Sequence, residues 1–201
     1  MRNLALQYPY AMEQAEVTSF LETYLAQLHK ALETADLEAL ETAILWLRDA
    51  RDRGKQIFVC GNGGSATTAS HFATDLGKGA SYRRQRRFRI MALTDSVSTI
   101  TAYANDVDYA CTFVEQLMNF AQPGDLVVAI SSSGNSSNVL RAVKYANELG
   151  CRTIGLTGGD GGKLASLAQL NLLTWEPHTG RVEDVHMSLC HMMSYYFMSG
   201  E

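Results

Sequence analysis

Hydrophobic positions recur at helical spacing in the first quarter of the chain, which predicts two helices. The first is expected over residues 12–31, where large apolar side chains fall three or four positions apart: Val17, Phe20, Leu21, Tyr24, Leu25 and Leu28. The second is expected from about Asp36, a residue type that caps helices, and its apolar side carries Leu40, Ile44, Leu45 and Leu47. We expect the two helices to form a helical hairpin.

The pattern changes at residue 55 to short apolar runs, each followed by a turn and a helical period. The runs are QIFVC (56–60), FRIMAL (88–93), LVVAI (126–130), RTIGL (152–156) and LNLLT (170–174). Apolar runs that alternate with helices predict parallel strands joined by right-handed crossovers. The expected fold class is α/β: a three-layer α/β/α sandwich around a five-stranded parallel sheet. We expect a single domain over 1–201, with 54–201 as the α/β core and the helices of 1–53 outside it.

The composition indicates a globular protein and argues against nucleic-acid binding, but it does not identify a function. The chain has 201 residues, of which 46% are hydrophobic and 19% charged, as in a globular protein with a sizeable core. Seventeen Lys and Arg against 21 Asp and Glu give a formal charge of -4, which argues against a nucleic-acid partner.

The cellular compartment is predicted from three features: the N-terminal sequence, the length of the apolar runs and the spacing of the cysteines. We expect no secretory signal and no membrane partner, because no apolar run approaches the ~20 residues that span a bilayer. The four cysteines are scattered without a C-x-x-C pair, so they are expected to be buried free thiols: Cys60, Cys111, Cys151 and Cys190. A cytoplasmic location is therefore expected.

The turn after the third apolar run has the composition of a phosphate site. Six small polar or glycine positions, residues 131–136 (SSSGNS), lie between a buried strand and a helix. Backbone N–H groups at a helix start and nearby hydroxyls together suit a phosphate dianion. The alternative is that Ser and Asn only cap the helix, but capping needs one such residue. We favour phosphate binding.

A second glycine-rich turn, residues 61–65 (GNGGS), follows the first apolar run. Missing side chains there allow a ligand to approach the backbone. The turn lacks the G-x-G-x-x-G spacing of a dinucleotide site and the Gly-Lys of a Walker A loop. It supports the phosphate interpretation only in combination with the serine-rich turn.

Histidine and carboxylate side chains are paired on two predicted helices. His71 and Asp75 stand at i, i+4 and share one helix face, while the last helix carries Glu183, Asp184, His186 and His191. Helical geometry places His191 about 20° from Asp184 and about 80° from Glu183, so both carboxylates are candidates. Two His and two carboxylates suit Zn²⁺ or another divalent ion. The alternative interpretations are a helix-surface hydrogen bond for the first pair and a packing role for His186 and His191.

Several motifs together resemble the SIS (sugar isomerase) domain family, and within it the phosphoheptose isomerases. They are CGNGGS with ASHFATDL, TAYAND, AISSSGNSSNVLRA, TIGLTGGDGGKLA and RVEDVHMSLCH, in this order over nearly the whole chain. The resemblance implies a flavodoxin-like fold and an enzyme that converts sedoheptulose 7-phosphate to a D-glycero-D-manno-heptose 7-phosphate. It also implies a homotetramer with active sites between subunits, in which the N-terminal helices pack.

The resemblance also assigns roles to residues. Substrate binding falls on Asn62, Gly63, Gly64 and the adjoining Ser65, on Asn105 and Asp106, and on the phosphate-binding Ser131, Ser132, Ser133 and Ser136. A metal is expected at His71, Asp75, Glu183 and His191, and catalysis at Asp75, Glu183 and His191. Zinc or another divalent metal is the expected cofactor.

Three positions depart from the family pattern. Asp75 stands where the family has a longer glutamate, Glu183 where it has a glutamine, and Gly79 near an expected substrate-contacting arginine. Lys78 or an arginine of the segment 83–89 is a candidate replacement for that arginine, although such runs are usually solvated loop faces. The departures favour an alternative, a non-catalytic protein of the family that binds a sugar phosphate or a partner, whereas His191 favours an enzyme.

Overall fold

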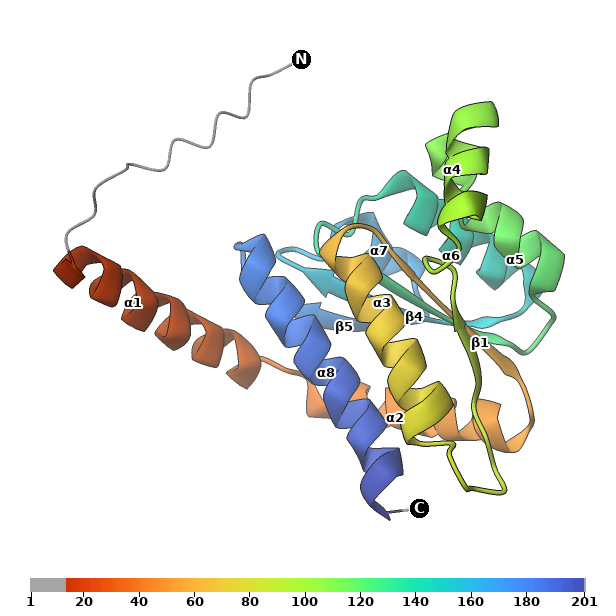
Figure 1. Ribbon diagram of the computed structural model, residues 1–201, viewed down its shortest axis with the longest axis horizontal. Coiled ribbons are helices and arrows are strands. Elements are labelled where there is room, and N and C mark those ends of the chain that lie inside the picture. The colour runs from red at the N-terminus through yellow and green to blue at the C-terminus, as the bar shows by residue number, and fades with distance from the viewer. Residues whose placement is uncertain (1–13, 201) are drawn as a thin grey trace.

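A five-stranded parallel sheet forms the centre of the computed structural model, which describes residues 14–200 (Figure 1). The strands lie in the order β2-β1-β3-β4-β5. All five coincide with the predicted apolar runs: β1 (Gln56–Gly61), β2 (Arg89–Ala92), β3 (Leu126–Ser131), β4 (Arg152–Gly158) and β5 (Leu170–Thr174). The order is that of flavodoxin-like sheets, and it reverses direction between β1 and β3, which is where such sheets bind ligands.

Alternating side chains bury the sheet on both faces. In β1, Ile57 and Val59 belong to one apolar cluster, and Phe58 and Cys60 belong to the other. These four side chains are inaccessible to solvent. A parallel sheet that is covered on both faces needs continuous apolar strands, which is why each of the five runs is detectable in the sequence.

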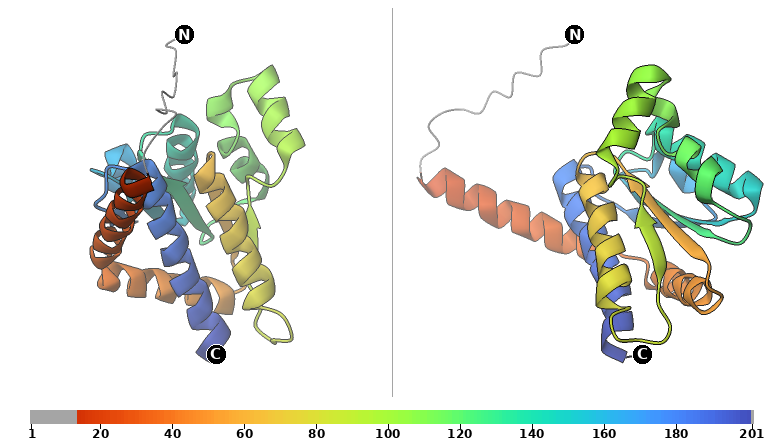
Figure 2. Two further views of the ribbon diagram at one scale, coloured as in Figure 1. Left: turned by 60° about the vertical axis from the view of Figure 1, so that its left-hand side comes forward. Right: turned by 45° about the vertical axis from the view of Figure 1, so that its right-hand side comes forward.

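Helices form the two outer layers and confirm the predicted three-layer sandwich. One face is covered by α2 (Leu37–Asp52), α3 (Gly64–Thr74) and α8 (Thr179–Gly200), and the other by α5 (Val114–Phe120), α6 (Ser137–Leu149) and α7 (Gly162–Leu167). The carboxylate of Asp36 accepts the backbone N–H groups of Glu38 and Ala39, as expected of the cap of α2. α3 and α8 lie side by side and run in the same direction (Figures 1 and 2).

The predicted hairpin of the first two helices is wrong. α1 (Gln14–Glu33) leads away from the sheet, and its main partner is α8 (Figure 2). Only its last turns reach the core, through Leu28, Ala31 and Leu32. α2 instead packs on the sheet through buried Leu40 and Leu47, so the α/β core includes α2 and does not begin at residue 54. Met12 and Glu13, the start of the predicted helix, lie outside the described residues.

The remaining helical segments connect the strands. α4 (Val97–Asp106) buries none of its side chains, and a short 3-10 turn (Tyr109–Cys111) follows it. At the end of α3 the chain continues as a π-helical turn (Asp75–Gly79), in which the Ala80 N–H donates to the Asp75 carbonyl. All four cysteines are buried and free, as predicted. None of the helices between residues 14 and 200 combines the length and apolarity needed to span a bilayer.

His186 is a fully buried titratable residue of α8. Burial lowers the pKa of its imidazole from 6.5 to about 4, because the charged form loses its hydration. The folded chain therefore binds fewer protons than the unfolded chain between these two values, and stability must fall as the pH is lowered through this range.

We predict that the free energy of unfolding falls between pH 7 and pH 4 more steeply in the unaltered chain than in His186→Leu. The difference should approach about 3 kcal/mol, the equivalent of the shift from 6.5 to about 4. Urea unfolding at a series of pH values measures it, with His29→Gln as the exposed control. Parallel curves for the unaltered chain and His186→Leu would contradict the prediction.

Candidate active site

A cavity of about 410 Å³ opens at the carboxyl end of the sheet, where the strand order reverses. It is lined by residues that come after β1, β3, β4 and β5: Asn62 and Ser65, Ser131 to Ser133 with Ser136, Gly158 to Asp160, and Glu176, Thr179 and Glu183. The cavity thus lies at the topological switch point, where open α/β sheets bind their ligands.

The serine-rich turn lines this cavity, and its Ser136 hydroxyl does not cap α6. Ser136 is the cap residue of α6, yet its side chain makes no capping hydrogen bond and lies 3.3 Å from the Ser131 hydroxyl. The hydroxyl oxygen of Ser132 is buried without a partner among the described residues. Helix capping therefore does not explain these serines. Unused donors beside a helix N-terminus are the arrangement that binds a phosphate.

Close packing fixes the turn in this shape. Gly134 has a φ of +61°, and a Cβ at that position would meet the carbonyl oxygen of Gly161 at 2.0 Å. Only glycine tolerates both the backbone conformation and the contact. The turns after β3 and β4 are therefore held against each other, and together they enclose the cavity.

A second helix start faces the same cavity. α3 begins after Gly63, which supplies no side-chain cap, and Ser65 in its first turn is buried and lines the cavity. Asn62 is held by a reciprocal amide pair with Asn138, at 2.9 Å for each bond, and accepts the Tyr109 hydroxyl. The first residue of α8, Thr179, also lines the cavity, so three helix N-termini converge there with their positive dipole ends.

Carboxylates also line the cavity, at Asp160, Glu176 and Glu183. Burial, and then the neighbouring Asp184 charge, raise the pKa of Glu183, which makes it a better proton acceptor at neutral pH. Arg181 holds the pKa of Glu176 below its usual value through a hydrogen bond. A phosphate is repelled by such groups, whereas sugar hydroxyls can donate to them. The cavity therefore offers hydroxyl and N–H donors for an anion together with carboxylate acceptors for sugar hydroxyls.

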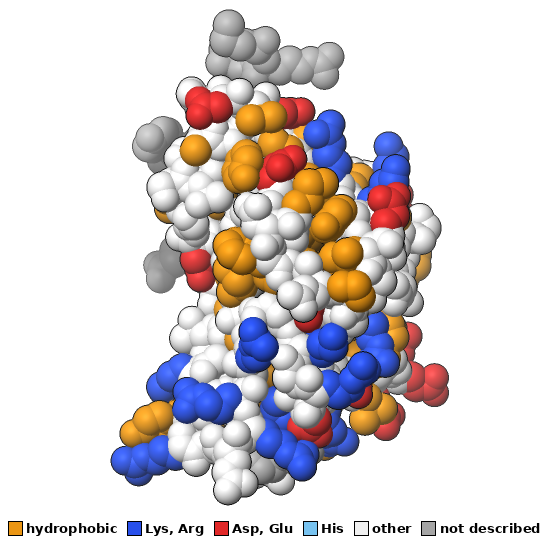
Figure 3. Space-filling view, turned by 90° about the vertical axis from the view of Figure 1, so that its right-hand side faces the viewer, with side chains coloured by type: hydrophobic (Ala, Val, Ile, Leu, Met, Phe, Trp, Pro, Cys, Tyr) orange, Lys and Arg blue, Asp and Glu red, His pale blue; other side chains and the backbone are white. Residues whose placement is uncertain are grey.

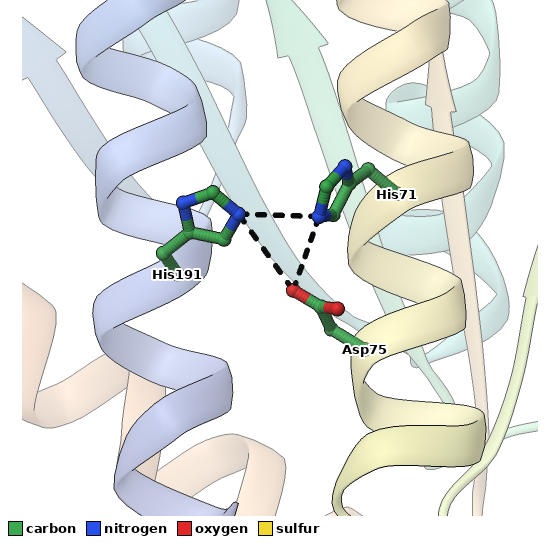
Figure 4. A group of neighbouring side chains, drawn as sticks. All are labelled: His71, Asp75 and His191. Carbon is green, nitrogen blue, oxygen red and sulfur yellow. Dashed lines mark hydrogen bonds and ion pairs between the residues drawn. The ribbon is translucent and has the colours of Figure 1, made fainter.

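His71, Asp75 and His191 meet between α3 and α8 (Figure 4). The two Nε2 atoms are 3.2 Å apart, and the Asp75 Oδ2 atom lies 3.5 Å from His71 and 3.9 Å from His191. Tetrahedral zinc with bonds of about 2.1 Å would place its ligands about 3.4 Å apart. The Asp75 Oδ2 atom is buried without a hydrogen-bond partner in the described part of the chain. The three residues therefore fit a divalent metal, as the i, i+4 spacing and the last-helix His predicted.

Glu183 does not meet these three residues in the structure, so its place as a fourth ligand stays a prediction. His191 comes eight residues after Glu183 on α8, and a helix rises about 12 Å over that distance. The Glu183 carboxylate instead fills the space above Gly64, where a Cβ would be 2.2 Å from its Oε2 atom. Asp184, the other candidate, accepts the Tyr24 hydroxyl at 2.8 Å on the side of α1.

Two further predicted residues lie away from the cavity of this chain. Asn105 and Asp106 stand at the exposed end of α4, where the Asn105 amide donates to Asp106. α4 projects from the edge of the sheet (Figure 1), so neither side chain lines the cavity.

The arginine segment also lies away from the cavity, because it precedes β2 and so belongs to the amino end of the sheet. Figure 3, which views the molecule from the right-hand side of Figure 1, shows Lys and Arg side chains gathered on the lower part of that surface. Arg84 donates to the Met198 carbonyl, Arg86 pairs with Asp52 at 3.0 Å and Arg89 donates to the Gly54 carbonyl. Neither Lys78 nor this segment lines the cavity, so neither replaces the missing arginine within one chain.

Sequence reasoning missed several residues of the cavity. Glu176 and Thr179, which line the cavity, come after the last strand, and Asn138, two positions after the serine-rich turn, holds the cavity residue Asn62. The detectable signal was their place after a strand end, because all such segments meet at one edge of a parallel sheet.

Comparisons with known proteins agree with this geometry. Residues 19–158 match the SIS domain model. The phosphoheptose isomerase of Aliarcobacter butzleri is 41% identical over 90% of this chain and 94% of its own. That of Helicobacter hepaticus is 39% identical over 77% of this chain and 79% of its own. The solved structure of phosphoheptose isomerase GmhA from Neisseria gonorrhoeae superimposes with a TM-score of 0.84 at 32% identity, over 91% of this chain and 99% of the other.

We predict that inorganic phosphate binds in the cavity and that Ser132→Ala weakens its binding about tenfold or more, the cost of one hydrogen bond to a charged group. Isothermal titration calorimetry measures the dissociation constant. Ser166→Ala removes a hydroxyl that bonds only within α7 and should leave the affinity unchanged. Equal affinities in the unaltered protein and Ser132→Ala would show that this hydroxyl does not face the anion.

Proposed function

The chain belongs to the SIS domain family and, within it, to the phosphoheptose isomerases, and on that premise we propose that it converts sedoheptulose 7-phosphate to D-glycero-D-manno-heptose 7-phosphate. The observation that carries the proposal is a cavity lined both by serine hydroxyls, of which that of Ser132 has no partner among the described residues, and by carboxylates. The relatives from Aliarcobacter, Helicobacter and Neisseria are isomerases, so the comparisons favour an enzyme over a non-catalytic protein that binds a sugar phosphate or a partner.

Binding is assigned to the turns at the strand ends. Ser131, Ser132, Ser133 and Ser136, with the N-terminus of α6, hold the phosphate, and Asn62, Gly63, Gly64 and Ser65 contact the sugar. Phosphate lies at the far end of the substrate from C1 and C2. The phosphate itself does not react, so its binding energy can hold the reacting carbons in place throughout the reaction.

Proton transfer is assigned to Asp75, Glu183 and His191. An aldose and a ketose interconvert when a base removes the proton at one carbon and returns it to the next through an enediol. Asp75 is assigned as a base and His191, whose Nε2 atom lies 3.9 Å from its carboxylate, as the acid partner. Glu183 faces the cavity as the second carboxylate that can accept the proton.

A divalent metal, zinc or a similar ion, is proposed as the cofactor at His71, Asp75 and His191. When bound, such an ion would polarise the carbonyl and hydroxyl oxygens at C1 and C2. The close approach of the two imidazoles and the unpartnered Asp75 oxygen support this assignment. The fourth predicted ligand, Glu183, stands about two helical turns before His191 on α8 and is not in contact with the other three in the structure.

A homotetramer with sites between subunits is the proposed assembly, in a cytoplasmic enzyme. α1 exposes Phe20, Leu21 and Leu25 by more than half of their surface, and α4 exposes Val97 by 70%. Apolar surfaces of this kind are usually covered by another protein. Packing of a second copy on α4 would bring Asn105 and Asp106 towards a neighbouring cavity, as the resemblance implies.

We predict that Asp75→Asn lowers kcat about a hundredfold or more, because the amide cannot accept the migrating proton. Glu183→Gln should have a smaller effect, since Glu183 has no imidazole partner within the described chain. Turnover of sedoheptulose 7-phosphate is followed by NMR, with Glu148→Gln on the exposed face of α6 as the control. A larger loss of kcat in Glu183→Gln than in Asp75→Asn would show that Glu183, and not Asp75, is the base. No turnover by the unaltered protein would refute the function.

We also predict that His71→Ala weakens zinc binding about a hundredfold or more, since loss of even an indirect partner of a metal costs about 10–100-fold. Competition with a chromogenic chelator measures the affinity, and elemental analysis of protein purified without chelator gives the metal content. His29→Ala, on the exposed side of α1, should bind zinc like the unaltered protein. Equal zinc affinity in His71→Ala would contradict the site.

A further inference from the structure

The segment between β5 and α8 forms part of the wall of the cavity. Glu176, Pro177 and Thr179 of this segment line the cavity. Glu176 is only 8% exposed, so its carboxylate is held inside the protein and not in bulk solvent. A buried carboxylate needs compensating partners, and the segment supplies them.

Two donors fix one oxygen of this carboxylate. Glu176 Oε1 accepts Nη2 of Arg181 at 2.8 Å and the backbone N–H of His178 at 2.8 Å. The other oxygen, Oε2, has no hydrogen-bond partner among residues 14–200. The two donors thus fix the orientation of the carboxylate through Oε1. Its other oxygen, Oε2, remains an acceptor with no partner in this part of the chain.

α1 holds the arginine in turn. The guanidinium of Arg181 lies 5.3 Å from the ring centroid of Tyr24, and Tyr24 donates its hydroxyl to Asp184 at 2.8 Å. The Tyr24 ring also packs edge-on against His178, with ring centroids 5.8 Å apart. Arg181 is 9% exposed, so its charge acts on Glu176 in a poorly hydrated setting.

This arrangement has a chemical use only for a ligand that combines an anion with hydroxyl groups. A free carboxylate oxygen repels a phosphate, and the adjacent guanidinium offsets that repulsion. The same oxygen accepts hydrogen bonds from sugar hydroxyls, and Arg181 keeps the pKa of Glu176 low, so that the group stays an acceptor. A site built to accept a hydroxyl strongly disfavours a ligand that lacks one.

We propose that Glu176 is a specificity-determining residue that accepts a hydrogen bond from a hydroxyl of the bound sugar phosphate, and that Arg181 is its positioning residue. The inference rests on the proposed function, because it assumes that the phosphate of the ligand lies in the serine-rich turn. It adds to that function a determinant outside the residues to which binding and proton transfer are assigned. Selection for a polyol chain then depends on the segment between β5 and α8.

The test compares two ligands by calorimetry: inorganic phosphate, and sedoheptulose 7-phosphate at equilibrium with any aldose formed. Glu176→Ala should weaken sugar-phosphate binding about tenfold or more and leave phosphate binding unchanged. Glu148→Gln serves as the exposed control. Unchanged binding of both ligands, an equal loss for both, or no preference of the unaltered protein for the sugar phosphate would overturn the inference.

Arg181 variants test the positioning role. Arg181→Lys keeps the positive charge and should retain more of the preference for sugar phosphate over phosphate than Arg181→Met does. Equal losses in the two variants would show that Arg181 only supports the fold. Failure of the proposed function is seen separately, as absence of turnover by the unaltered protein in the NMR assay, which does not depend on the ratio of the two affinities.

Discussion

The reversal of strand order between β1 and β3 is the constraint on which the rest of the molecule depends. Neighbouring crossovers leave the sheet on opposite faces at this point, so the turns after β1 and β3 separate and a space opens between them. The next helices along the chain from these turns, α3 and α6, then begin at the edge of that space. Both helix N-termini therefore border the space in which we expect the phosphate to bind.

The parallel packing of α3 on α8 places a second set of polar side chains along the interface between these two helices. At the cavity end, the absence of a side chain at Gly64 makes room for the Glu183 carboxylate. Further along the same pair of helices, His71 and Asp75 face His191. The helix pair α3 and α8 therefore carries Glu183 at the cavity and the cluster of His71, Asp75 and His191 farther along. For both groups to act in one reaction, a bound substrate or a second copy of the chain has to span the distance between them.

The sequence predicted features that depend on neighbouring residues in the chain, and it did not predict features that depend on contacts between distant residues. The five strands and the serine-rich turn were predictable because buried strands and turn residues leave local patterns. The pairing of His71 with Asp75 was predictable from helical spacing alone. The direction of α1 was not, because an exposed apolar face has the same spacing as a buried one. Glu176 was not either, since its role depends on Arg181, and Arg181 depends on Tyr24, 157 positions earlier in the chain.

The π-helical turn at Asp75–Gly79 has a consequence for how the chain tolerates changes in length. Such turns hold one more residue than an α-helical turn, so an inserted residue is taken up inside the helix without breaking it. Because the wide turn begins at Asp75, the added length displaces only the arginine-bearing loop that leads to β2. An insertion after the start of this turn can therefore reshape that loop while His71, in α3, and Asp75, the first residue of the turn, keep their places.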